Sequence, residues 1–509
     1  MLGYLKRLVV TGAAYQFGDI VAKALALLTL PLYTRHVSPQ GYGAAETLLT
    51  AVILASIVLR GGVGEAFIRF YFDDTDEQRR ARIARTATAT VAWTTTLASL
   101  VAVALAGPLS DALLGFHDPL LVDCAVLGLW AFTNLEMAYA QLRVDERART
   151  YVYASGANVL LSVSFTVALV VFADQGARGL LLGNFGASAV VVLGLWWVLR
   201  GRFSLRARFS DLRAMLHFGL PTVPADASVY ALQVVDRFYL FRSYSHGSAG
   251  LYAVAIKLAT VVFVAVRGFQ YAWPPLAYSI ESDEEAAGLY SLVTTYYVLA
   301  TGVVVCAVAL LGRWMVRLLA APEFFGAHKA LPWLALGWSL YGLYLVFVAI
   351  SGRARVTSRN FPAAACGLAV NVVLLLLLVP ASAAGLGSEG AGIALCGAYV
   401  AMLIVMYTLT RKLFTVAFQW RRLGQLTLLL GGVAVAGELL LPTSGLAGFA
   451  SRLAWLALVP ALLLLTRFFE PHELAGARAL LADARRRVVD FRASRGDLEA
   501  YAEDPLRDV

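Results

Sequence analysis

Charged residues are scarce in this sequence. Of its 509 residues, 15% are charged and 60% are hydrophobic, and the mean hydropathy is +0.71. An ordinary soluble domain is about 25% charged and about 45–50% apolar. The composition therefore excludes a soluble globular protein and indicates a chain that crosses a membrane many times.

Cysteine is also rare, and its positions exclude two common kinds of site. The four cysteines lie far apart in different apolar runs and form no CxxC pair; they are Cys124, Cys306, Cys366 and Cys396. A disulfide framework or a zinc site needs closer and more regular spacing. We interpret all four as small apolar packing residues and predict no metal site.

The sequence lacks the motifs of common enzymes. It contains no HExxH, GxSxG or P-loop. The one acidic cluster that resembles a metal-binding DxD, at residues 73–76, adjoins Arg79 and Arg80 and is interpreted as a solvated loop. A membrane glycosyltransferase, acyltransferase or glycan polymerase would need external catalytic acids, histidine or a large outer loop. The longest external loop expected here is residues 312–328, so we predict a protein that is not an enzyme.

Long apolar runs are abundant. About 20 apolar residues span the ~30 Å hydrocarbon core of a bilayer, and runs of this kind predict an all-α polytopic protein with about fourteen transmembrane helices. The predicted spans cover residues 11–35, 42–68, 83–106, 119–142, 151–173, 178–199, 215–243, 249–279, 287–311, 329–351, 360–380, 390–410, 424–441 and 446–466.

The 42 Lys and Arg residues are distributed unevenly among the predicted loops. Most fall at the two termini and in the loops after the even-numbered spans. Because cytoplasmic loops are enriched in Lys and Arg, both termini are predicted to be cytoplasmic. The formal charge of +9 is then a topology signal, and no nucleic-acid partner is predicted.

Two halves of the chain carry similar segments. LPLYTRHVSPQGYGAAE, which begins at Leu30, resembles FYLFRSYSHGSAGLYAVA, which begins at Phe238. Internal repeats are frequent in transporters, and chance similarity between Gly- and Ala-rich helices is the alternative. The predicted domains are an N-terminal bundle at 1–213, a C-terminal bundle at 214–422, two further helices at 423–466, and a cytoplasmic tail at 467–509. The tail is either an amphipathic helix on the membrane surface or a solvated segment.

Five basic residues fall inside apolar spans, all in the first, second, seventh and eighth. They are Lys23, Arg60, Arg237, Lys257 and Arg267. A charge at mid-membrane costs on the order of 3 kcal/mol, so it normally faces a cavity or a partner. Because arginine pairs with phosphate through two parallel hydrogen bonds, we predict that these cations bind an anionic headgroup such as a pyrophosphate. The alternatives are snorkelling to the interface and, for Lys23, pairing with Asp19.

Acidic residues lie in the same four spans, Glu46 among them. Four are candidates for coupling transport to a proton or a sodium ion, and otherwise for pairing with the cations: Asp19, Glu65, Asp226 and Asp236. No other cofactor is predicted. Residues three or four apart share a helix face, which places Glu46, Thr50, Arg60 and Gly64 on one stripe. The same spacing places Asp226, Tyr230, Gln233 and Arg237 on another.

Several short segments resemble the polysaccharide-transport flippases of the Wzx type, which belong to the MOP superfamily together with MATE drug exporters and lipid II flippases. The segments are Phe218-Gly219-Leu220-Pro221, Asp236-Arg237, Gly250-Leu251-Tyr252-Ala253 and Trp273-Pro274-Pro275, and the stretch from Pro31 to Gly43 resembles the first hairpin of that family. The similarity of layout covers residues 1–466. One departure, Phe241-Arg242-Ser243, stands where a small or aliphatic stretch is expected and leaves the outer end of the seventh span open.

The resemblance implies two six-helix bundles around a central cavity, lined by the first, second, seventh and eighth spans, with the last two spans appended. It implies movement of an undecaprenyl-pyrophosphate-linked oligosaccharide from the inner to the outer leaflet of the bacterial cytoplasmic membrane by alternating access. The implied partners are the lipid-linked oligosaccharide, membrane lipids and glycan-assembly enzymes. The alternatives are a lipid II flippase, which shares the pyrophosphate, and a MATE-like cation exporter, which the basic residues disfavour.

Overall fold

The structure, a computed structural model, describes residues 23–73, 76–145, 147–202, 204, 206–232, 234–280, 282–354, 359–471 and 473. Within these residues all regular structure is helical, which confirms the all-α prediction. The chain divides into one compact unit that ends at Gln419 and a second that begins at Trp420. The predicted division of the first unit into two bundles stays a prediction.

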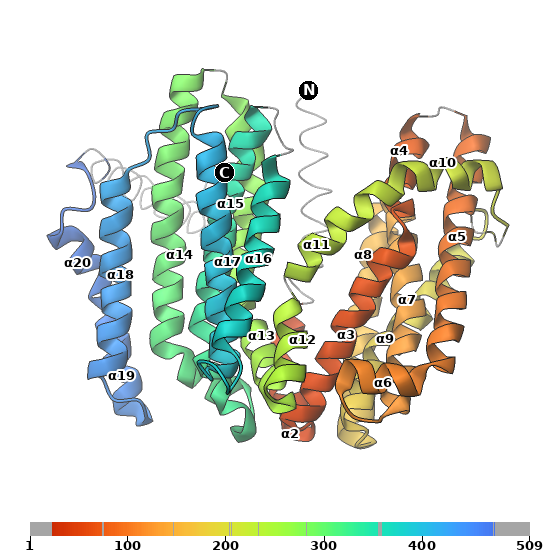
Figure 1. The fold of residues 1–509 in the computed structure, drawn as a ribbon, viewed down its shortest axis with the longest axis horizontal. Coiled ribbons are helices and arrows are strands. Elements are labelled where there is room, and N and C mark those ends of the chain that lie inside the picture. The colour runs from red at the N-terminus through yellow and green to blue at the C-terminus, as the bar shows by residue number, and fades with distance from the viewer. Residues whose placement is uncertain are drawn as a thin grey trace, which may run out of the picture. The chain divides into compact units, whose positions relative to one another are not determined.

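The helices carry the labels of Figure 1. In the first unit they are α2 (Leu30–His36), α3 (Pro39–Arg60), α4 (Val63–Asp73), α5 (Glu77–Ala104), α6 (Ala106–Leu114), α7 (Pro119–Val144), α8 (Ala148–Val167), the π-helix η1 (Ala168–Phe172), α9 (Gly176–Val198), α10 (Phe209–Gly219), the 3-10 helix η2 (Leu220–Thr222), α11 (Val223–Leu232), α12 (Val235–Ser243), α13 (His246–Ser279), α14 (Asp283–Leu319), the 3-10 helix η3 (Pro322–Lys329), α15 (Leu331–Arg353), α16 (Asn360–Leu378) and α17 (Gly387–Thr410). The second unit contains α18 (Trp420–Leu440), α19 (Gly445–Ala457) and α20 (Val459–Leu465).

Twelve candidate spans in the described residues are long and apolar enough to cross a membrane. They correspond to twelve of the fourteen predicted spans. Of the other two, most of the span at 11–35 lies outside the described residues, and the span at 215–243 is interrupted. The chain is a multi-pass membrane protein, as its composition predicted.

Polar caps fix where long helices begin. Ser38 accepts a hydrogen bond from the Gly41 amide at 3.2 Å at the start of α3, and Asp118 accepts one from the Leu121 amide at 3.1 Å at the start of α7. Both caps are followed by a proline, whose missing amide hydrogen is not needed in the first turn. Short polar signals therefore set these helix starts inside a largely apolar sequence.

The predicted single span at 42–68 is wrong, because α3 stops at Arg60. Gly61 and Gly62 follow with φ of +54° and +70°, in the left-handed region that glycine adopts without a steric penalty. Helix α4 then begins in a new direction (Figure 1). The spacing assigned Gly64 to one stripe with Glu46 and Arg60. Gly64 lies in α4, however, whereas those two residues lie in α3.

The predicted span at 215–243 is also not one helix; it is the succession α10, η2, α11 and α12. Pro221 lies in η2, where it removes a backbone donor. At Val234 the backbone leaves the helical region, with φ of −135° and ψ of −14°. Helix α11 packs against both α3 and α16, and Figure 1 shows it crossing obliquely between them. This interrupted segment therefore contacts both an early and a late helix of the first unit.

The external loop predicted at 312–328 is largely helical. Helix α14 continues to Leu319, and after two residues the chain enters η3. Phe324 of η3 is fully buried, and its ring centroid lies 5.8 Å from that of Tyr42 in α3. Burial of an aromatic side chain against α3 explains why this segment folds onto the bundle.

Helices α3 and α13 touch backbone to backbone near their starts. A Cβ at Gly43 would lie 2.5 Å from the carbonyl oxygen of His246 and 2.8 Å from the amide nitrogen of Gly250, and a Cβ at Gly250 would collide with the carbonyl of Pro39. Small residues permit this close approach in membrane helices, where packing drives association. The two glycines thereby bring the polar faces of α3 and α13 within reach of each other.

The second unit is a hairpin of α18 and α19 closed by a buried arginine. Arg452 is fully buried; its Nη1 lies 2.5 Å from Glu438 Oε2, and its Nε donates to the Pro442 carbonyl at 3.1 Å. Trp455 donates a further hydrogen bond to the Val433 carbonyl at 3.0 Å. These contacts neutralise a charge at the turn of an otherwise apolar hairpin. The predicted tail at 467–509 lies mostly outside the described residues.

We expect Gly62→Ala to destabilise the protein. A left-handed conformation costs an L-residue about 1–2 kcal/mol, and the new Cβ would also collide with the backbone of Gly219. Thermal unfolding of the purified protein in detergent should show a lower Tm than wild type. Gly64→Ala is the matched control, because nothing lies within 4 Å of its Cβ position. Equal Tm values for the two variants would contradict this explanation of the helix break.

Candidate functional site

Glu46 of α3 lies between two of the predicted cations. Its Oε1 is 2.6 Å from Nζ of Lys257 in α13, and its Oε2 is 3.7 Å from Nη1 of Arg237 in α12. Nη1 of Arg237 also donates to Thr50 Oγ1 at 3.1 Å, and Nζ of Lys257 donates to the Tyr42 hydroxyl. Exposed fractions of 13%, 30% and 17% for Glu46, Lys257 and Arg237 show that the charges are largely buried. One carboxylate therefore offsets two cations on two other helices.

The sequence contains part of the signal for this network. Tyr42, Glu46 and Thr50 are four residues apart, so they lie on one face of α3, and the structure turns that face toward α12 and α13. The sequence-based set left Glu46 out and gave Tyr42 no role. The tyrosine hydroxyl of Tyr42, one helical turn from the carboxylate of Glu46, is the sequence signal that could have identified both residues.

Asp236 lies at the break between α11 and α12 and is 1% exposed. Its Oδ1 accepts the backbone amide of Arg237 at 2.8 Å, and its Oδ2 accepts the hydroxyl of Tyr252 in α13. Amides in the first turn of a helix have no partner within it, so this carboxylate stabilises the start of α12. Asp236 and Arg237, adjacent in sequence, thus contact different side chains. The coupling role of Asp236 stays a prediction.

Lys23 and Arg267 share one aromatic ring. Nζ of Lys23 lies 4.4 Å from the ring centroid of Phe263, and Cζ of Arg267 lies 4.8 Å from it. Nη1 of Arg267 donates to Gln270 Oε1 at 3.0 Å, while its buried Nε has no hydrogen-bond partner in the part of the chain that the structure describes. A cation over a ring face is stabilised by the ring, so two basic side chains meet at Phe263.

Two other predicted residues, Arg60 and Glu65, lie in neither group. Arg60 ends α3 and donates from Nε to a carbonyl of its own helix at 3.4 Å, and Glu65 is exposed on α4. Asp19 and Gln233 lie outside the described residues, and only the backbone of Asp226, in α11, is described. The roles assigned to these residues stay predictions.

Two cavities lie on either side of α3, and Leu49 lines both. One has a volume of about 190 Å³ and is lined by aromatic and aliphatic side chains of α3, α11, α13, α15 and α17, together with Asp236 and Arg237 of α12. The other, of about 250 Å³, is lined by aliphatic side chains, by amides and hydroxyls of α8 and α9, and by Glu46 and Lys257. The Glu46 network thus adjoins two spaces of different chemistry.

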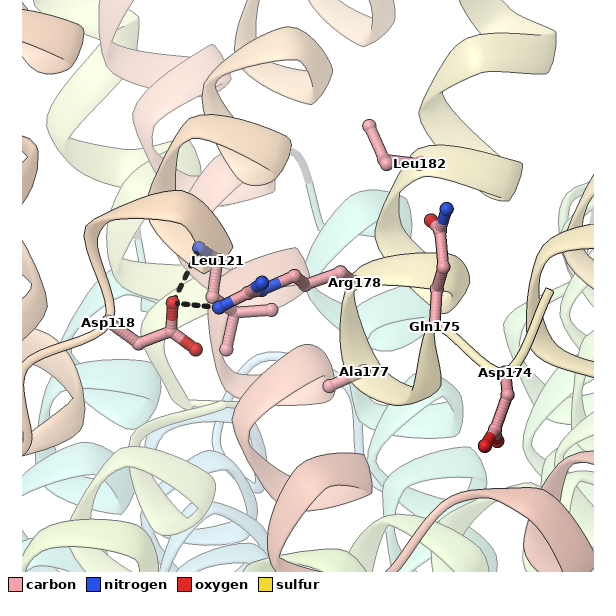
Figure 2. Close-up of a pocket in the computed structure, with 7 residues that line it drawn as sticks. All are labelled: Asp118, Leu121, Asp174, Gln175, Ala177, Arg178 and Leu182. Carbon is pink, nitrogen blue, oxygen red and sulfur yellow. Dashed lines mark hydrogen bonds and ion pairs between the residues drawn. The ribbon is translucent and has the colours of Figure 1, made fainter.

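A larger hollow, of about 620 Å³, lies at the starts of α7 and α9 (Figure 2). There the Oδ1 of Asp118, which also caps α7, is 2.9 Å from Nη2 of Arg178. None of the predicted cations lines this hollow. Because the two charges neutralise each other and tie α9 to α7, we assign the pair a structural role.

The chain matches the family model for polysaccharide biosynthesis proteins over residues 32–319, which is more than half of its length. A protein of the Lsg locus of Haemophilus influenzae is 24% identical over 275 residues, which cover 52% of this chain and 64% of that relative. The match therefore spans less than two thirds of the relative's length.

Two solved structures share this fold over most of the chain. The lipid II flippase MurJ, in an inward closed conformation, has a TM-score of 0.69 at 12% identity, with 89% of this chain and 97% of that chain covered. An inward-facing multidrug resistance MATE transporter of the MOP superfamily has a TM-score of 0.60 at 14% identity, with 80% and 95% covered. At such low identities the likeness shows the fold.

The chain thus has the fold of the lipid II flippase MurJ and of a MATE transporter of the MOP superfamily, as the resemblance of its sequence implied. The chain belongs to the polysaccharide biosynthesis protein family. The resemblance of its short segments to polysaccharide-transport flippases is thereby confirmed at the level of family and fold.

We expect Glu46→Gln to lower the free energy of unfolding by about 3 kcal/mol. The change leaves Lys257 and Arg237 largely buried beside a neutral amide, and breaking a buried ion pair costs about 3–5 kcal/mol. Lys257→Met should have a similar effect, and the double variant should recover part of the loss because both charges of the pair are then absent. Thermal and denaturant unfolding in detergent measure these changes.

The matched control is Glu65→Gln, which removes an exposed carboxylate and should unfold like wild type. If Glu46→Gln unfolds like this control, the pair does not stabilise the fold. If the double variant loses the sum of the two single losses, Glu46 and Lys257 are not coupled.

Proposed function

We propose that this chain moves an undecaprenyl-pyrophosphate-linked oligosaccharide from the inner to the outer leaflet of a bacterial cytoplasmic membrane by alternating access. The observation that carries the proposal is that two basic side chains, Lys23 and Arg267, lie against the same ring, Phe263. Membership of a polysaccharide biosynthesis family supports a glycan as cargo. The fold shared with a lipid II flippase supports a substrate attached to a lipid.

Two adjacent phosphates need more than one cation when they leave water. Arginine supplies a planar fork of donors that matches phosphate oxygens, and Lys23 adds a second charge on the same ring. Glu46 already pairs with both Lys257 and Arg237, whereas Arg267 forms no ion pair within the described residues. We therefore assign the pyrophosphate to Lys23 and Arg267, and assign the Glu46 network to holding α3 against α12 and α13. Alternating access would have to separate α3 from α13 at this network.

A lipid II flippase is the second candidate, and the similarity of fold to MurJ favours it. Both substrates carry a pyrophosphate on a polyprenyl chain, so the cations serve either. A MATE-like exporter of organic cations is disfavoured, because the basic residues around Phe263 would repel its substrate. The glycan beyond the pyrophosphate distinguishes the first two candidates.

The membrane potential supports the proposed direction. With a negative interior, outward movement of an anion is downhill by about 2.3 kcal/mol per charge for each 100 mV. The empty transporter must then return its cationic site to the inner leaflet. We propose that this step is coupled to binding of a proton or sodium ion at Asp19, Glu65, Asp226 or Asp236. Glycan-assembly enzymes that supply the substrate are proposed partners.

We propose that both termini are cytoplasmic, since most Lys and Arg residues lie at the termini and in the loops on their side. A reporter that is active only in the cytoplasm should be active when fused after Val509. The same reporter should be inactive when fused after Ala320, between α14 and η3. The opposite pattern of activity would contradict the orientation.

We expect Arg267→Ala and Lys23→Ala each to reduce translocation at least tenfold, because each removes a charge from the pyrophosphate site. The measurement is the rate at which labelled polyprenyl-pyrophosphate glycan becomes accessible on the opposite leaflet of liposomes that contain the purified protein. Arg317→Ala is the matched control: Arg317 also lies over a phenylalanine, 5.9 Å from the Phe325 centroid, but at the end of α14. Rates in the two site variants equal to that of the control would overturn the assignment.

A further inference from the structure

The cavity of about 190 Å³ beside α3 has an unusual lining for the interior of an apolar bundle. Three of its residues are the aromatic side chains Tyr230 of α11, Trp338 of α15 and Tyr399 of α17, and Arg237 and Thr50 add polar groups. Binding sites for small polar molecules commonly combine aromatic walls with a few hydrogen-bonding groups. The lining therefore indicates a ligand that has both an apolar face and polar substituents.

A row of aromatic rings connects this cavity to the cations at Phe263. The ring centroids of Phe263 and Trp338 are 4.4 Å apart in a T-shaped contact, and those of Trp338 and Tyr341 are 6.0 Å apart. Tyr341 in turn lies 5.6 Å from Tyr399. Trp338 thus contacts the ring that carries Lys23 and Arg267 on one side and lines the cavity on the other. A group directly attached to a bound phosphate would reach the cavity.

The polar atoms of these aromatic residues are available to a ligand. Within the described part of the chain, the indole nitrogen of Trp338 and the hydroxyls of Tyr399 and Tyr230 have no hydrogen-bond partner. Trp338 and Tyr230 are half-buried, and Tyr399 is 2% exposed. Buried Trp and Tyr usually find a partner for the N–H or O–H group. Three such groups around one cavity indicate a ligand rich in hydroxyls.

A single pyranose ring fits this lining better than other candidates. Its C–H face packs on aromatic rings, and its hydroxyls both donate and accept hydrogen bonds. A purely apolar ligand would leave three donors unsatisfied, at a cost for each buried group, and a bare phosphate would not use the aromatic surface. A cavity of about 150 Å³ holds a benzene-sized ring, so 190 Å³ accommodates one substituted six-membered ring and not a longer glycan.

We propose that this cavity binds the first sugar ring of the substrate, the ring bonded directly to the pyrophosphate. Trp338 supplies the stacking surface and an N–H donor, and the hydroxyls of Tyr399 and Tyr230 bind sugar hydroxyls. The inference rests on the proposed function, because the phosphate held at Phe263 sets the position of the sugar. These three residues would then determine which first sugar is accepted, while the cations bind any polyprenyl pyrophosphate.

The test compares two ligands on the full chain in nanodiscs: a short-chain polyprenyl pyrophosphate, and the same molecule bearing one N-acetylhexosamine. Wild type should bind the sugar-bearing ligand about tenfold more tightly, as expected for one stacking contact with added hydrogen bonds. Trp338→Ala should abolish this preference, so that the two ligands bind with equal affinity. Trp338→Phe should retain part of it, and Tyr399→Phe, which keeps the ring, should reduce it. Arg267→Ala should lower the affinity for both ligands by the same factor.

The controls separate this inference from the proposed function. Trp197→Ala, which removes a tryptophan that is 71% exposed, should bind both ligands like wild type. If wild type binds both ligands with equal affinity, or if Trp338→Ala and Tyr399→Phe keep the full preference, the sugar site is overturned while the pyrophosphate site stands. If wild type binds neither ligand, the proposed function fails and this inference fails with it.

Discussion

The carboxylate of Glu46 is the interaction on which the central arrangement depends. The membrane interior offers no water to solvate separated charges, so Lys257 and Arg237 need an acid close by. Because one carboxylate serves both cations, it fixes α3 relative to α12 and α13 at the same time. The backbone contact at Gly43 and Gly250 lets the helices come close enough for these side chains to meet. Movement of α3 away from α13 therefore has an electrostatic cost as well as a packing cost.

Interrupted helices place the charged groups where continuous ones could not. The break at Val234 starts a new helix at which Asp236 accepts a backbone amide, while the next residue, Arg237, reaches across to α3. On one regular helix, neighbouring side chains point about 100° apart, and the carboxylate would have no free amide to bind. Breaks of this kind are tolerated in membrane proteins where the backbone is covered by protein or lines a cavity. Here the break adjoins the aromatic cavity.

The five intramembrane cations are therefore not equivalent. Lys257 and Arg237 are offset by Glu46 and connect helices, whereas Lys23 and Arg267 both lie against the ring of Phe263. Phe263 also contacts Trp338, whose other side lines the cavity. A ligand in which an anionic group is bonded to a ring would place the anionic group near Phe263 and the ring in the cavity. This arrangement is the reason we propose a lipid-pyrophosphate site and a sugar site side by side.

The sequence by itself determined the all-α membrane class, most of the spans and the segments that carry the charges, because these follow from composition and from local runs of apolar residues. It also placed Glu46 and Thr50 on one helix face. The breaks after Arg60 and at Val234 were missed because mean hydropathy continues across them. Only the tertiary structure decided that Glu46 pairs with Lys257 and that two cations share Phe263. These contacts depend on which helix faces pack together. The sequence of a membrane helix says little about its packing partner, because many of its faces carry similar apolar and small residues.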